Sequence, residues 1–64
     1  MSEREDNFER MLAHVTKEYA DTCEKLERLR AEGKTKTATY RQLISRKLEY
    51  GDILSLYKLF GLSD

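Results

Sequence analysis

A regular spacing of apolar and small residues in the first half of the chain most constrains its fold. Seven of them recur in alternating steps of four and three: Phe8, Leu12, Val15, Tyr19, Thr22, Leu26 and Leu29. This is the heptad pattern of a helix that packs along one stripe against another helix. The chain has no proline and only three glycines, so little interrupts helix formation. The spacing predicts a long helix over about residues 6–32.

The residues at both ends of this predicted helix suit its boundaries. Ser2 with Glu5, or Asp6 with Glu9, has the spacing of a capping box. Gly33 can adopt the left-handed backbone conformation that closes a helix. At about 1.5 Å per residue such a helix is roughly 40 Å long, which exceeds the wall of a small compact globule. We therefore expect one arm of a hairpin or of a coiled coil.

A threonine-rich turn, GKTKTA, follows the first helix. Its residues are poor helix formers and good turn and cap residues. Thr39 and Gln42 have the spacing of a second capping box. Because a turn of this length joins neighbouring antiparallel helices, the sequence predicts an all-α hairpin whose second helix begins near Thr39.

The pair Gly51-Asp52 divides the rest of the chain. A glycine followed by an aspartate is typical of one helix ending and the next beginning, so we predict helices over about 39–50 and 52–60. The alternative is one continuous helix over 39–60. Its inner stripe would contain Tyr40, Leu43, Lys47, Tyr50, Leu54 and Tyr57.

The predicted C-terminal helix is apolar on nearly every side. Only Asp52, Ser55 and Lys58 are polar in the segment DILSLYKLF. A helix of this kind must be covered on several sides, whereas two helices packed along one seam bury only one face each. We therefore expect a second copy to cover it in a helical-bundle homodimer, and the alternative partner is a different protein. The residues predicted to mediate self-association are Ile53, Leu54, Leu56, Tyr57, Phe60 and Leu62.

Positive charge gathers around the predicted turn. Five bases and no acid lie between Gly33 and Leu48, although the whole chain has a formal net charge of zero. Clustered bases can neutralise nucleic-acid phosphates, and an exposed tyrosine can stack on a base. The possible nucleic-acid contacts are Arg28, Arg30, Lys34, Lys36, Tyr40, Arg41, Arg46 and Lys47. The other interpretation is that these bases suit the end of the first helix and keep the protein dissolved.

The sequence contains no recognisable catalytic, metal or cofactor site. With one cysteine, Cys23, the chain cannot form an internal disulfide, and His14 is the only other soft ligand for a metal such as zinc. We expect His14 at the surface and Cys23 as a buried small side chain. The tripeptide GKT lacks the upstream glycine of a phosphate-binding loop, because position 28 is Arg28. We therefore expect no enzyme activity, no metal and no cofactor.

These observations predict one small helical domain over 1–64. A lone cysteine favours a reducing compartment, and the charged N-terminal residues differ from a signal peptide. No apolar run approaches the roughly 20 residues of a membrane-spanning helix, so we expect a cytoplasmic protein without membrane contact. The leading hypothesis is a small non-enzymatic interaction or regulatory module that self-associates. The alternative is a nucleic-acid-associated accessory protein of the DNA-binding or transcription-regulator type.

Overall fold

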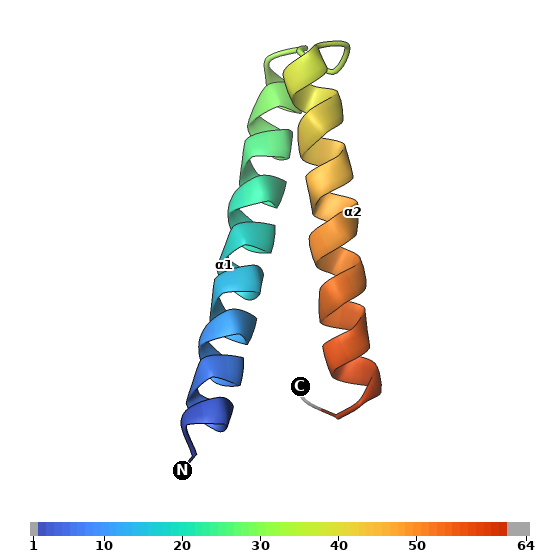
Figure 1. The fold of residues 1–64 in the computed structure, drawn as a ribbon. Helices are drawn as coiled ribbons and strands as arrows, with labels where there is room; N and C mark the ends of the chain where they lie inside the picture. The colour runs from blue at the N-terminus through green and yellow to red at the C-terminus, as the bar shows by residue number, and fades with distance from the viewer. Residues whose placement is uncertain (1, 62–64) are drawn as a thin grey trace.

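The computed structural model describes residues 2–61 as two antiparallel helices joined by a short turn (Figure 1). Helix α1 spans Glu3–Ala31 and helix α2 spans Ala38–Leu59. The Cα trace measures 47 × 19 × 18 Å, so the hairpin is a rod. The prediction of an all-α helical hairpin is confirmed. We call the end of the rod opposite the turn the open end.

Local hydrogen bonds fix both ends of α1. The backbone N–H of Glu5 donates to the hydroxyl of Ser2 at 3.2 Å, so the first of the two predicted caps is used. After the helix, Gly33 has a φ of +73°. The N–H of Lys34 then donates to the carbonyl oxygen of Leu29 at 2.8 Å. These features form a Schellman motif, which ends α1 and turns the chain back. Gly33 therefore closes the helix as predicted.

Helix α2 is capped by Thr37. The Thr37 hydroxyl accepts the N–H of Tyr40 at 3.1 Å and donates to the carbonyl oxygen of Lys34 at 3.0 Å. Thr39 lies within the first turn of the helix, so the predicted cap at Thr39 is wrong by two residues. Threonines alternate through the turn, and spacing alone could not choose among them. The bond to Lys34, made possible by the preceding helix closure, selects Thr37.

Helix α2 continues through Gly51 without a break. The prediction of separate helices over 39–50 and 52–60 is therefore wrong, and the alternative of one continuous helix describes the chain. A Cβ added at Gly51 would lie 3.5 Å from Cε1 of Tyr19. The ring of Tyr19 thus packs against the Gly51 backbone. This contact helps offset the roughly 1 kcal/mol that a glycine costs inside a helix.

The inner stripes of the two helices form the seam of the hairpin. Val15, Thr22 and Leu26 of α1 and Tyr57 of α2 are buried. All seven heptad residues of α1 are buried or half-buried, as the spacing predicted. At the open end the rings of Phe8 and Tyr57 pack edge to face, with centroids 5.1 Å apart. The seam therefore extends along most of the rod.

Candidate interaction surface

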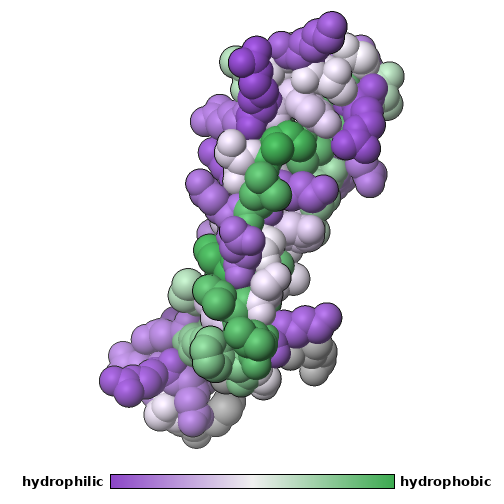
Figure 2. Space-filling model, turned by 90° about the vertical axis from the view of Figure 1, so that its right-hand side faces the viewer, coloured by the Kyte–Doolittle hydropathy of each residue, from purple (hydrophilic) through white to green (hydrophobic). Residues whose placement is uncertain are grey.

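Helix α2 exposes large apolar side chains on its sides away from the seam. The relative exposures are 75% for Leu59, 72% for Phe60, 62% for Leu48 and 56% for Leu56. Figure 2 views the molecule from the α2 side and shows apolar surface along this helix, gathered most strongly toward the open end. Such a collection of apolar side chains on a small protein is typical of a binding surface.

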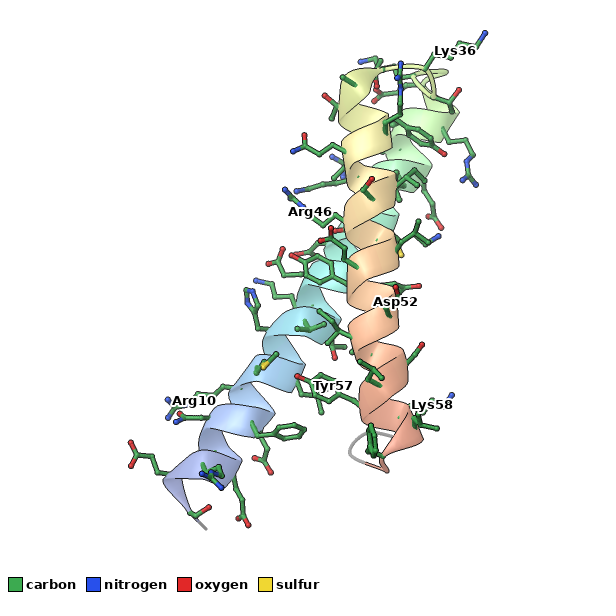
Figure 3. All side chains as sticks on the ribbon, turned by 45° about the vertical axis from the view of Figure 1, so that its right-hand side comes forward. Arg10, Lys36, Arg46, Asp52, Tyr57 and Lys58 are labelled. Carbon is green, nitrogen blue, oxygen red and sulfur yellow. The ribbon has the colours of Figure 1, made fainter. Side chains whose placement is uncertain are left out.

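The residues predicted for self-association fall into three environments. Leu56 and Phe60 are exposed, and Ile53 and Leu54 are half-buried. Tyr57 is buried and points toward α1 (Figure 3), so its ring belongs to the seam. Leu62 lies outside the described residues.

Three exposed apolar residues were not in that predicted set. Leu48 and Leu59 lie on the side of α2 opposite the seam, and both are exposed. Met11 of α1 is 52% exposed. Met11 lies beside the heptad stripe of α1, directly before Leu12. The narrow seam leaves Met11 outside it.

The eight residues of the predicted basic cluster do not share one face. Arg28 pairs with Glu24 at 3.6 Å, and Lys34 pairs with Glu32 at 3.1 Å, both on the surface. Lys47 is half-buried on the inner stripe of α2. In Figure 3, Lys36 points away from the turn while Arg46 projects sideways from α2. The bases therefore surround the turn end and form no continuous strip.

The aromatic member of this cluster is already engaged. Nη2 of Arg30 donates a hydrogen bond to the Tyr40 hydroxyl oxygen at 3.2 Å. This bond raises the pKa of Arg30 above its ordinary value. A raised folded-state pKa contributes stability below the ordinary pKa of arginine and loses it only at higher, strongly alkaline pH. The pair therefore introduces no pH dependence near neutrality.

The remaining chemical groups are isolated. His14 is exposed and Cys23 is half-buried, so Cys23 is less buried than predicted. Among residues 2–61, no three His, Cys, Asp or Glu side chains are grouped so that they could hold a metal ion. Neither α1 nor α2 combines the length and apolar character of a membrane-crossing helix.

Comparisons with protein-family models, curated proteins and solved structures find no match to this chain. On the described surface, the exposed apolar side chains Leu56, Leu59 and Phe60 gather at the open end of α2.

Proposed function

We propose that this chain is a small non-enzymatic protein-interaction module that self-associates through the apolar C-terminal half of α2. The observation that carries the proposal is the exposure of Leu56, Leu59 and Phe60 on the isolated hairpin. Burial of one leucine or phenylalanine side chain contributes about 1.5–3 kcal/mol. Several such side chains supply enough free energy to offset the entropy lost when two small chains associate.

The total surface of the hairpin supports the same proposal. A compact protein of 7.6 kDa exposes roughly 4,300 Å², whereas this chain exposes 5268 Å². The excess, about 1,000 Å², is close to the roughly 800 Å² that each partner buries in an interface of standard size. A second copy of the hairpin would therefore bury an area about equal to the excess surface that the rod exposes.

Light scattering over a wide range of protein concentration tests self-association. We expect a dimer mass at high concentration and dissociation on dilution. Leu56→Asp places a charge in the apolar area and should shift the protein to monomer. Ser55→Asp is the matched control, because Ser55 is exposed and already polar. A monomer mass for the unmodified chain at every concentration would contradict the proposal.

A nucleic-acid-associated role, the alternative function, has weaker support. Lys36, Arg41 and Arg46 are exposed, but the cluster is divided around the turn and partly paired with acids. Reversal of Lys34, Lys36, Arg41 and Arg46 to glutamate should leave the mass of the assembly unchanged. Fluorescence anisotropy with labelled DNA tests the alternative directly. Binding that the reversal abolishes, and that weakens steeply between about 50 and 200 mM salt, would favour it.

A further inference from the structure

The apolar residues outside the seam, exposed or half-buried, lie on two adjoining sides of the hairpin. The first, which we call the Met11 flank, consists of Met11 on α1, of Ile53 and Leu56 on α2, and of Phe60, the residue that follows α2. The second, which we call the outer face, contains Leu48 and Leu59 on the side of α2 opposite the seam. Only the Met11 flank involves both helices.

Register places Met11 beside Ile53. The contact between Phe8 and Tyr57 fixes which parts of the helices lie level at the open end. Met11 is three residues from Phe8 in the direction of the turn, and Ile53 is four residues from Tyr57 in the same direction. Since each helix rises about 1.5 Å per residue, Met11 and Ile53 lie at nearly the same height on the rod.

The heptad pattern places these residues on the same side of the seam. In heptad notation, the seam residues Leu12 and Leu54 occupy a positions. Met11 and Ile53 directly precede them and therefore occupy g positions, and Phe60, seven residues after Ile53, occupies the next g position. In antiparallel helices the g positions face one another across one side of the seam. The positions of two labelled residues agree with this assignment. Arg46 is a g residue and Lys58 is an e residue, and Figure 3 shows them on opposite sides of α2.

We propose that the second copy packs on the Met11 flank, so that both helices of each hairpin contribute to a four-helix core at the open end. This inference rests on the self-association proposed above and adds its location. It also gives α1 a contact residue, Met11. The two copies use the same surface, as in a two-fold symmetric dimer.

The order of residues on each surface favours the flank over the outer face. Ile53, Leu56 and Phe60 are spaced by three and four residues, so they form one unbroken stripe. On the outer face, Asp52 and Ser55 lie between Leu48 and Leu59. Packing there would remove the Asp52 carboxylate from water with no basic residue beside it on that stripe, and burial of an unpaired charge is strongly unfavourable.

Charge limits the contact to the open end. Nearer the turn, the same side of the hairpin carries Lys25 and Arg46, and Glu49 follows on α2; all three are exposed. These side chains favour water over an apolar interface. The Met11 flank is therefore an apolar area with a charged border on its turn side. This is the common arrangement of a contact core and its polar rim.

A pair of matched substitutions tests the location. Met11→Glu and Leu48→Glu each place the same charge at a residue more than half exposed in the hairpin, so neither removes much packing within it. We expect Met11→Glu to raise the dimer dissociation constant at least about 10-fold, a change equivalent to 1.4 kcal/mol. Leu48→Glu should change it less than about 2-fold. Sedimentation equilibrium measures both constants, and circular dichroism verifies helix content.

The outcomes separate this inference from the proposed function. If the unmodified chain is monomeric at every concentration, the proposed function fails and this inference fails with it. If the chain dimerises and Leu48→Glu weakens the dimer as much as Met11→Glu or more, self-association stands and the Met11 flank is the wrong surface. If the chain dimerises and neither substitution matters, the flank is again excluded. Loss of the dimer with Met11→Glu alone supports the inference.

Discussion

Gly51 shows how one residue type can indicate two different structures. In the sequence, Gly51 before Asp52 is typical of a helix boundary. In the hairpin, Gly51 has no positive φ, and the ring of Tyr19 lies against its backbone. Gly33, by contrast, has a φ of +73° that few residues other than glycine adopt readily. The two glycines therefore have opposite roles, one inside a helix and one at its end.

We expect Gly51→Ala to stabilise the protein by about 1 kcal/mol, because alanine favours the helix and an added Cβ would make an ordinary contact at 3.5 Å. The unfolding midpoint in urea measures the change. Gly33→Ala is the comparison variant and should destabilise the protein by about 1 kcal/mol, since alanine is strained at positive φ. A lower midpoint for Gly51→Ala would mean that the Tyr19 ring cannot accommodate the methyl group.

At the scale of the helix, the residues at the two ends of each helix determine its bounds more than its average composition does. Helix α1 was predicted well because its heptad stripe is regular. Helix α2 was harder because it is apolar on several sides and has Lys47 on its inner stripe, half-buried in the hairpin. A lysine stem can pack along a seam while its ammonium group reaches water. The regular half of the fold could therefore be predicted from the sequence. The sequence alone did not show that α2 continues through Gly51, beside the ring of Tyr19 from the other helix.

The cap of α2 gives a prediction at this scale. Thr37→Ala removes the hydroxyl that accepts the Tyr40 N–H and donates to the Lys34 carbonyl. We expect a loss of about 1 kcal/mol in the free energy of unfolding. Thr39→Ala keeps the cap and should be neutral or slightly stabilising, since alanine is the better helix former. Equal losses in the two variants, measured by chemical denaturation, would show that Thr37 has no special role.

At the scale of the whole molecule, the hairpin has a seam but little interior. Only Val15, Thr22, Leu26 and Tyr57 are buried among the described residues. The sequence indicated this shortage, because two helices cannot cover an apolar C-terminal segment. The sequence could not show that Tyr57 is buried in the seam whereas Leu56 and Phe60 remain exposed. That division depends on the rotation of a continuous α2, and the predicted break at Gly51 obscured it.

Self-association also predicts how stability depends on concentration. When folding is coupled to dimer formation, mass action raises the unfolding temperature with protein concentration. We expect the midpoint to rise over a 100-fold range of concentration for the unmodified chain. Leu56→Asp should remove most of this dependence. A midpoint that stays constant for the unmodified chain would indicate that the hairpin unfolds as a monomer.

The continuity of α2 through Gly51 has a mechanical consequence. One stiff helix connects the basic turn to the apolar open end, and from Ala38 to Leu56 it extends about 27 Å. A partner bound at the open end therefore also determines where the turn lies. Two hairpins joined at their open ends would hold their turns at a separation determined by helix length.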